Sequence, residues 1–554
     1  MKLKTLFMQA ISAAAICSFA LASIGQTVQP AFPVKRVENA DMWRTDGWNA
    51  INLAKNQKIR TGKAKNVILF MGDGMGISTL TAARIFEGQR RGESGEENRL
   101  SFEEFPFSAL SKTYGTNQQT SDSAPTMSAI ITGVKTDEGI LSVDQNVSRA
   151  NYKTVKGNET RSLLELAEIA GKSTGVVSTA RLTHATPGAC YAHTADREWE
   201  SDYDMFRLAE KATKDKQPEL AKLHQEAFDA KFPDIARQLI EFPYGDGLEV
   251  ALGGGRAKFL PREMQDPEKD SDKGERRDGR DLTQEWVKKH NNSAYVWNKS
   301  SFDAIDVKKT DHLLGLFNRS HMEYEHQRLA DRGGEPSLSE MTAKSIDLLS
   351  KNRNGYFLMV EGGRIDHGHH DGNAYRALSE TVELSNAVRT ALAKVDLDET
   401  LIVVTADHSH TFFIQGYPLR GNNILGLVRE IDDMGNPTAE FKRDKFGLPM
   451  TTLGYANGKG YSGKSNKQGE GPKKCCGEAD SFEPYSKGRP DLTNTNVLDP
   501  DYLQEAGIPL GGETHGGEDV AIFATGVNAH LVRGSMEENW IFYVMADALR
   551  LGRK

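Results

Sequence analysis

A short apolar run that ends in a cluster of metal-ligand residues is the feature that most constrains the fold of this chain. Tyr356–Val360 is continuously apolar, which predicts a buried strand, and the sequence EGGRIDHGHH follows it. Apolar residues at helical spacing resume from Asn373. Asp366 and His370 lie four residues apart, so on a helix they share one face and can bind one cation, for which zinc is well suited. The alternative is a solvated polar turn rich in histidine.

Two other apolar runs end in the same way. Asn66–Met71 leads into a glycine turn around Asp73, and the β-branched run Glu399–Thr405 leads into Asp407 and His408. Open α/β sheets bind ligands at the carboxyl ends of their strands, so we expect these side chains to meet at one edge of a sheet. The glycine turn has neither the Gly-Lys-Ser/Thr of a P-loop nor the downstream acid of a dinucleotide fold, which disfavours nucleotide binding.

The histidines are concentrated in and beside these motifs. Of the 14 in the chain, the following lie there: His184, His193, His367, His369, His370, His408, His410 and His515. This concentration argues against a polar turn. Thr186 follows a strand predicted at Lys172–Thr179 and offers a hydroxyl to a hard cation, and Arg197 can bind two phosphate oxygens. Taken singly, either residue could belong to an ordinary loop.

Ser123 lies where a helix is predicted to begin. Pro125 is tolerated in the first turn of a helix, and small and apolar residues follow it. The positive end of the helix dipole there favours an alkoxide and an incoming anion. The alternative is that Asp122 or Ser123 merely caps the helix.

The bulk composition describes a soluble globular protein. The chain has 554 residues, of which 26% are charged, and its mean hydropathy is −0.54. This length predicts one large α/β domain with insertions, or several domains. The formal net charge of −8 argues against nucleic-acid binding based on overall charge.

The N-terminus predicts export to the periplasm or the cell exterior. Lys2 and Lys4 precede an apolar run at Leu6–Leu21, and small residues follow it, so residues 1–25 are interpreted as a signal peptide. The alternative is a retained membrane anchor. Residues 549–554 are not a hydrophobic tail, so a glycolipid anchor is not indicated.

The rest of the chain, residues 26–554, divides into four segments. Residues 26–65 form a polar arm with a helix, whose Trp43 and Trp48 predict docking onto the body or onto a second subunit. Residues 66–415 carry the strand motifs and form the catalytic domain. Composition shifts to Gly, Lys, Asn and Asp in residues 416–512, which predicts an inserted, exposed subdomain, and residues 513–554 complete the catalytic domain.

Taken together, these motifs resemble those of the alkaline phosphatases. The resemblance covers about residues 43–551, in family order, and its segments are FMGDGMG at 70–76, Asp122-Ser123-Ala124, VEGGRIDHGHH at 360–370, TADHSH at 405–410 and Glu513-Thr514-His515. It is closer to the animal-type enzymes than to the enterobacterial one, because His184 and His367 stand where the latter has Asp and Lys. It implies a three-layer α/β/α sandwich around a large, mostly parallel sheet, with a crown-like insert.

The resemblance also assigns the site residues. It implies a phosphomonoesterase with two zinc ions and one magnesium ion, and Ser123 as the nucleophile. The implied ligands are Asp366, His370 and His515 for one zinc, Asp73, Asp407 and His408 for the other, and Asp73, Thr186 and Glu361 for magnesium. Arg197 would bind the phosphate, while His184 and His367 would lie beside the ions without binding them.

Further family features match in part. Glu268, the carbonyl of Phe317 and Glu335 correspond to a family calcium site, but Asn318 replaces an acid, which predicts weak binding or none. A homodimer is implied, with the N-terminal helix and Tyr417 reaching across. Small phosphate monoesters are the expected substrates, with no nucleic-acid-binding domain and no membrane span in the mature protein.

Two other functions compete with this one. A phosphodiesterase or a sulfatase can use the same metal scaffold, but no Cys-x-Pro-x-Arg context stands at the nucleophile, and a diesterase favours threonine there. A phosphate- or metal-binding surface protein without catalysis is the non-enzymatic alternative.

The cysteines left after removal of the signal are Cys190, Cys475 and Cys476, an odd number that predicts at least one free thiol. The sequence leaves open the physiological substrate, the pH optimum and the role of the insert.

Overall fold

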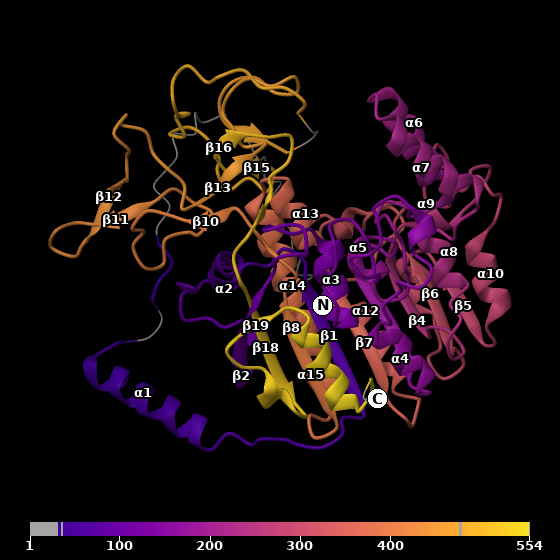
Figure 1. The fold of residues 1–554 in the computed structure, drawn as a ribbon. Coiled ribbons are helices and arrows are strands. Elements are labelled where there is room, and N and C mark those ends of the chain that lie inside the picture. The colour runs from indigo at the N-terminus through magenta and orange to yellow at the C-terminus, as the bar shows by residue number, and fades with distance from the viewer. Residues whose placement is uncertain (1–30, 35–36, 476–478, 553–554) are drawn as a thin grey trace, which may run out of the picture.

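A computed structural model describes residues 31–34, 37–475 and 479–552, and Figure 1 shows a central sheet covered by helices on both faces. The predicted signal peptide and Cys476 lie outside these described residues. Within them, no helix is long and apolar enough to cross a membrane.

The central sheet has ten strands. Their order across the sheet is β19 (Ser535–Glu537), β2 (Phe107–Lys112), β18 (Val520–Gly526), β8 (Thr400–Thr405), β1 (Asn66–Gly72), β7 (Tyr356–Gly362), β3 (Ser173–Arg181), β4 (Val250–Gly254), β6 (His312–Leu316) and β5 (Ser293–Val296). Only β18 runs antiparallel to its neighbours in this described sheet. The predicted large, mostly parallel sheet is confirmed. A parallel strand is covered on both faces, which is why the central strands read as unbroken apolar runs.

Alternate residues of β1 enter two separate cores. Val67, Leu69 and Met71 face one core, whereas Ile68 and Phe70 face the other, because successive side chains of a strand point to opposite faces. The first core is closed by α3 (Ser123–Thr132), α4 (Leu163–Ile169), α8 (Ile235–Ile240), α10 (Leu282–Lys289) and α15 (Trp540–Leu549). The second is closed by α2 (Ile77–Arg90), α12 (Leu338–Leu349) and α14 (Ala374–Lys394). The predicted α/β/α layering is confirmed.

The segment after the sheet's β8 forms small sheets that stand above the carboxyl ends of the central strands (Figure 1). β10 (Phe412–Ile414) pairs with β13 (Leu453–Gly458), which pairs with β16 (Ala506–Pro509). The remaining pairs are β11 (Arg429–Ile431) with β12 (Pro437–Phe441), β14 (Lys473–Lys474) with β15 (Tyr502–Leu503), and β17 (His515–Gly516) with β9 (Ser409–His410). The domain boundaries at 416 and 512 stay a prediction.

The N-terminal helix α1 (Ala40–Lys55) extends away from the body (Figure 1). None of its residues is buried, and the side chains of Trp43 and Trp48 are 55% and 66% exposed. Docking onto the body of its own chain, one of the two predicted arrangements, is therefore wrong. Docking onto a second subunit stays a prediction.

Residues 200–350 contain more structure than the sequence indicated. β5 and β6 were not predicted there. Arg276, in the charge-rich segment 262–280, is fully buried and pairs with Asp234 at 2.9 Å. Its partner lies 42 residues away, so no local pattern reveals it. The other helices are α5 (Ala185–Gly188), α6 (Asp202–Lys214), α7 (Pro218–Asp229), α9 (Arg256–Phe259), α11 (Lys299–Asp303), α13 (Arg364–His370), η1 (Ser101–Glu104), η2 (Tyr152–Thr154), η3 (Arg328–Ala330) and η4 (Ala529–Leu531).

Candidate metal centre and nucleophile

Three adjacent strands deliver buried carboxylates to one edge of the sheet. Asp407 follows β8, Asp73 follows β1, and Glu361 lies at the end of β7, and all three side chains are fully buried. The turn after β1 requires glycine, because Gly74 has φ +68° and a Cβ atom there would lie 2.3 Å from Nε2 of His410. The backbone N–H of Gly74 donates to Asp407 Oδ1 at 3.1 Å, which ties two strand ends together.

A first cluster joins Asp366 and His370 of α13 to His515 of β17. Nε2 of His370 lies 3.2 Å from Asp366 Oδ1, and Nε2 of His515 lies 3.4 Å from the same oxygen. The two Nε2 atoms are 3.0 Å apart. Each ring holds its Nδ1 against a backbone carbonyl, that of Glu513 for His370 and that of Ser121 for His515, at 2.6 and 2.7 Å.

These two carbonyls orient the rings of His370 and His515. A carbonyl can only accept, so Nδ1 of each ring donates to it, and Nε2 is the nitrogen that faces the cluster. The two Nε2 atoms face each other across 3.0 Å, beside a carboxylate. A ring nitrogen bound to a metal has this arrangement, with its other nitrogen donating to a carbonyl.

A second cluster surrounds the hydroxyl of Ser123. Nε2 of His408 lies 3.1 Å from Ser123 Oγ, 3.4 Å from Asp73 Oδ1 and 3.5 Å from Asp407 Oδ2. Oδ2 of Asp73 and Oδ2 of Asp407 are buried without a hydrogen-bond partner. The His408 ring also stacks on that of His515, with 3.6 Å between ring centroids. The first and second clusters are therefore contiguous.

A third group of oxygens lies behind Asp73. Oε1 of Glu361 and Oγ1 of Thr186 are both buried without a hydrogen-bond partner, while Ser178 donates to the other oxygen of Glu361. His184 contributes a nitrogen within metal-binding range of Asp73 and Glu361. Burial raises the pKa of Glu361 to about 7. Carboxylate and hydroxyl oxygens suit magnesium, whereas the imidazoles of the other clusters suit zinc.

The buried carboxylates at this edge are not neutralised by the positive side chains beside them. Burial, together with the charges of Asp407, Asp366 and Glu361, raises the pKa of Asp73 well above its usual range. Burial also raises the pKa of Asp407. Arg197 is one cation beside several acids, and buried charges in proteins are paired or coordinate metals. The donor set therefore fits cations in all three clusters.

Ser123 is the first residue of α3, as predicted, and is 2% exposed. Asp122 makes no capping hydrogen bond, so the capping alternative is wrong for that residue. Its carboxylate instead accepts from Nη1 of Arg197 at 2.8 Å, and Nη2 of Arg197 lies 3.1 Å from Nε2 of His184. Asp122 thus holds the guanidinium beside the serine.

The sequence left His410 without a role. Its Nε2 lies 2.9 Å from Asp366 Oδ1, and its Nδ1 lies 2.5 Å from Oε2 of Glu513. Although burial opposes it, the charge of Glu513 and bonds to both acids raise the pKa of His410 to about 10. His410 therefore orients Asp366. His410 and Glu513 both belong to the motifs recognised in the sequence, but they meet only because β9 pairs with β17.

Four other histidines lie near the clusters. His369 is buried between the Thr79 hydroxyl and the Tyr455 hydroxyl, at 2.9 and 2.8 Å, so it belongs to the core. His184 and His367 pack 5.5 Å apart between ring centroids. His321, which the sequence did not single out, packs against His367 with 4.0 Å between ring centroids.

The residues matched to a calcium site are already engaged with one another. Nδ2 of Asn318 donates to Glu335 at 2.9 Å, and the fully buried Arg256 pairs with Glu268 at 2.7 Å. An amide N–H group and a guanidinium thus occupy carboxylate oxygens that a calcium ion would need. Phe317 is buried beside them. Tyr417, the residue predicted to reach across a dimer, is 85% exposed.

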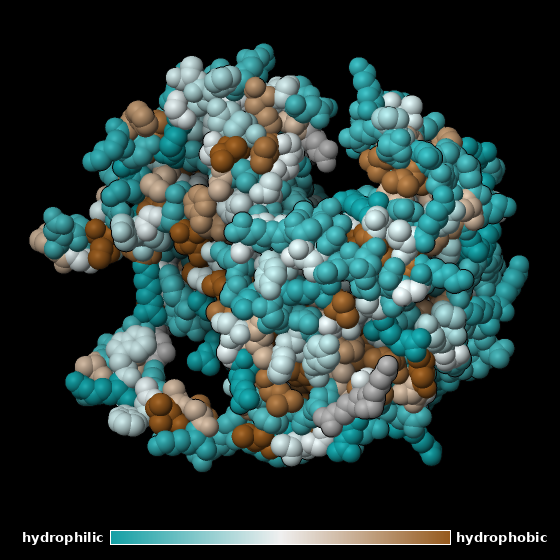
Figure 2. Space-filling model, viewed as in Figure 1, coloured by the Kyte–Doolittle hydropathy of each residue, from teal (hydrophilic) through white to brown (hydrophobic). Residues whose placement is uncertain are grey.

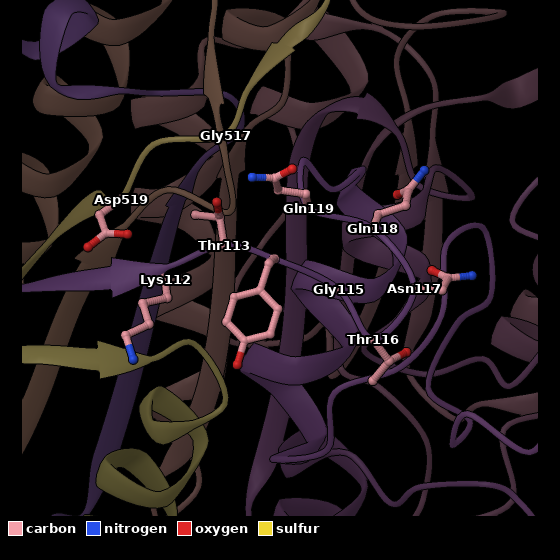
Figure 3. A pocket seen from close by; sticks show the side chains of 10 residues that line it. Lys112, Thr113, Gly115, Thr116, Asn117, Gln118, Gln119, Gly517 and Asp519 are labelled. Atoms are coloured by element: carbon pink, nitrogen blue, oxygen red, sulfur yellow. The ribbon is translucent and has the colours of Figure 1, made fainter.

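A polar cavity of about 530 Å³ borders the loops that carry Ser123 and His515 (Figure 3). Amide and hydroxyl side chains make up much of its lining, together with Lys112 and Asp519 (Figure 3). Its lining comprises Lys112, Thr113, Tyr114, Gly115, Thr116, Asn117, Gln118, Gln119, Gly517 and Asp519.

An α/β sheet that gathers buried ligand clusters around a serine at a helix start defines a metal-dependent hydrolase. The alkaline phosphatase family model matches residues 64–551. The tissue-nonspecific alkaline phosphatase of Mus musculus is 41% identical over 544 residues, which cover 97% of this chain and 94% of the relative. The chain belongs to the alkaline phosphatase family and is a metal-dependent phosphomonoesterase. The predicted resemblance to animal-type enzymes is confirmed.

Other known proteins agree with this assignment. The alkaline phosphatase of Gadus morhua is 41% identical, covering 90% of this chain and 94% of the relative. Among solved structures, alkaline phosphatases from Thermus thermophilus and from the Antarctic bacterium TAB5 match with TM-scores of 0.58 and 0.54, both at 21% identity. They cover 90% and 88% of this chain, and the matches cover 94% and 99% of those chains. At that identity the structures support the fold alone.

Proposed function

We propose that this protein hydrolyses phosphate monoesters through a phosphoserine on Ser123, at a site for two zinc ions and one magnesium ion. The observation that carries the proposal is the convergence of Nε2 of His370 and Nε2 of His515, 3.0 Å apart, on Oδ1 of Asp366. With both Nδ1 atoms held by backbone carbonyls, these two nitrogens and the carboxylate form a ligand set for one cation. The proposed ligands follow the three clusters: Asp366, His370 and His515; Asp73, Asp407 and His408; and Asp73, Thr186 and Glu361.

The protein's own residues perform the transfer. The N-terminus of α3 favours the alkoxide of Ser123, whose Oγ bonds to phosphorus as the bond to the leaving alcohol breaks. Arg197, held by Asp122, binds two non-bridging phosphate oxygens. Water then hydrolyses the phosphoserine, releasing phosphate and restoring Ser123. When bound, the cations supply positive charge beside the attacking and leaving oxygens and lower the pKa of bound water.

We also propose broad specificity, export and a homodimer. Broad specificity rests on the match to the alkaline phosphatase family. The exposed tryptophans of α1 and the exposed Tyr417 support a second subunit as their partner. The signal peptide predicted at residues 1–25 supports export.

A phosphodiesterase is the second candidate, because the same metal scaffold serves diesters. The serine nucleophile and the Asp122–Arg197 pair favour the monoester. A monoester has three non-bridging oxygens, so one is left for other contacts when the arginine binds two, whereas a diester has only two in all. Turnover of aryl phosphate and of bis-aryl phosphate separates the two functions. Preference for the diester would overturn the proposal.

Metal content and acid trapping test the nucleophile and ions together. Purified enzyme incubated with phosphate and quenched at low pH should carry phosphoserine at Ser123, with close to two zinc ions and one magnesium ion per chain. Ser123→Ala should keep the metals, lose the label and lose several orders of magnitude in kcat. Unchanged turnover in Ser123→Ala would contradict the phosphoserine mechanism, and no turnover by the wild type would support the binding-protein alternative. After chelation, zinc should restore most activity, and restoration by calcium alone would contradict the metal assignment.

A further inference from the structure

A cavity of about 700 Å³ lies under the helical hairpin of α6 and α7, away from the metal centre. In Figure 1 this hairpin projects from the upper right of the body, beside α8. Residues from α6, α7, α8 and the loop 261–280 line it: Asp202, Met205, Phe228, Asp229, Lys231, Phe232, Asp234, Arg237, Arg262, Arg277, Asp278 and Arg280. Its volume falls within the range of small-molecule sites. None of these residues belongs to the clusters described above.

The base of this cavity is rigid. Arg276 is fully buried behind it and binds both Asp234 and Asp278 through its guanidinium, at 2.9 and 2.5 Å. Asp234 also caps α8, accepting from the N–H of Arg237 at 2.9 Å. Asp202, at the start of α6, accepts from the backbone N–H of Arg277 at 3.1 Å. Three of the four lining acids are therefore committed to holding the loop against α6 and α8.

Two of the five lining cations are less committed. No carboxylate pairs with the side chain of Arg277 or of Lys231 within the described part of the chain, whereas Arg262 pairs with the exposed Glu263. The other two, Arg237 and Arg280, pair with glutamates outside the cavity. The guanidinium of Arg277 instead stacks on Phe206, 3.6 Å from the ring centroid. A guanidinium held on an aromatic ring keeps its N–H groups available for an anion.

An apolar surface lies beside these cations. Met205 is buried, and Phe228 and Phe232 are partly buried. Phe228 packs on Phe206 with 5.7 Å between ring centroids, so the aromatic surface is continuous with the ring under Arg277. An apolar wall next to the unpaired guanidinium of Arg277 is suited to a molecule that has both an apolar and an anionic part.

We propose that this cavity binds an amphiphilic anion, an apolar body that carries a sulfonate, carboxylate or phosphate group. The anionic group binds Arg277 and Arg262, and the apolar body packs against Phe228 and Phe232. The site is independent of the proposed catalytic mechanism, because it uses none of the metal ligands. It gives the protein a second ligand site outside its active centre.

The test uses 8-anilinonaphthalene-1-sulfonate as the probe, with the metal-loaded full chain. Fluorescence titration should show saturable binding of one probe per chain. Arg277→Gln and Arg262→Gln should each weaken the affinity about tenfold, or about 1.4 kcal/mol. Arg353→Gln, at an exposed arginine outside the cavity, is the matched control and should bind as the wild type does. All variants should keep their phosphatase activity, which shows that they fold.

Two results would overturn the proposal. One is an affinity for the probe that is the same in Arg277→Gln, Arg262→Gln and the control Arg353→Gln. The other is displacement of the probe by inorganic phosphate at concentrations that saturate the active site, because the probe would then lie at the metal centre. Neither result depends on how the phosphatase reaction proceeds.

Discussion

A buried and a partly buried carboxylate at the amino end of β3, those of Glu168 and Glu249, should make the protein lose stability as the pH rises. Oε1 of Glu168 accepts from the hydroxyl of Thr174 at 2.5 Å, and Oε2 of Glu249 accepts from the backbone N–H of the same residue at 2.6 Å. Burial, followed by the charge of Glu249, raises the pKa of Glu168 to about 9. Burial raises the pKa of Glu249 to about 7.

The sign follows from proton binding. Between the ordinary pKa of 4.5 and the folded pKa of about 9, folded Glu168 keeps a proton that the unfolded chain has lost. The free energy of unfolding therefore falls by about 1.4 kcal/mol per pH unit in that window and levels off above it. From pH 6 to pH 9 the loss from this one group is at most about 4 kcal/mol.

Glu168→Gln removes this titration. The glutamine carbonyl can still accept from Thr174, so the packing is retained. Urea unfolding followed by circular dichroism, at pH 6 and pH 9.5 with fixed free metal concentrations, should show a smaller pH-dependent loss in the variant, by several kcal/mol. Glu440→Gln, at an exposed glutamate, is the control. Its free energy of unfolding should fall between the two pH values by as much as that of the wild type. Equal losses in Glu168→Gln and wild type would refute the reasoning.

Three further predictions concern the metal centre and the subunit contact. His410→Ala should release zinc about 10–100-fold more readily, measured by competition with a chelator, because Asp366 loses its orienting partner; unchanged retention would contradict that role. Arg197→Ser should lower kcat/KM about 100-fold or more while metal content stays constant; a loss of metal instead would show a structural role. Replacing Trp43 and Trp48 with serine should shift the protein towards monomer in light scattering without changing its circular dichroism; an unchanged mass would exclude α1 from the dimer contact.

The strand-end carboxylates were predictable because they obey a local rule. Asp73, Glu361 and Asp407 each follow an unbroken apolar run, and parallel strands place their carboxyl ends together. The helix-face pairing of Asp366 with His370 was equally local, and the two side chains meet at 3.2 Å. Family resemblance supplied what spacing could not, namely that His515 joins this pair.

Contacts between distant segments were not predictable in this way. His410 and Glu513 are separated by 103 residues and meet through a two-residue strand pair. The Arg276–Asp234 pair is hidden because a charge-rich segment resembles a solvated loop, and only the fold shows that its guanidinium is buried. The predicted docking of α1 onto its own body failed because tryptophans on a helix indicate an apolar partner but do not identify it.

The two ends of the central sheet stabilise their acids in different ways, and this difference determines how each end responds to pH. At the carboxyl ends of β8, β1 and β7, the acids require cations, and metal binding favours deprotonated ligands. At the amino end of β3, Glu168 and Glu249 are instead stabilised by a proton. Raising the pH therefore favours the metal centre while it destabilises the opposite end of the same sheet. A variant such as Glu168→Gln should therefore remain folded and active at higher pH than the wild type, without altering kcat at pH 8.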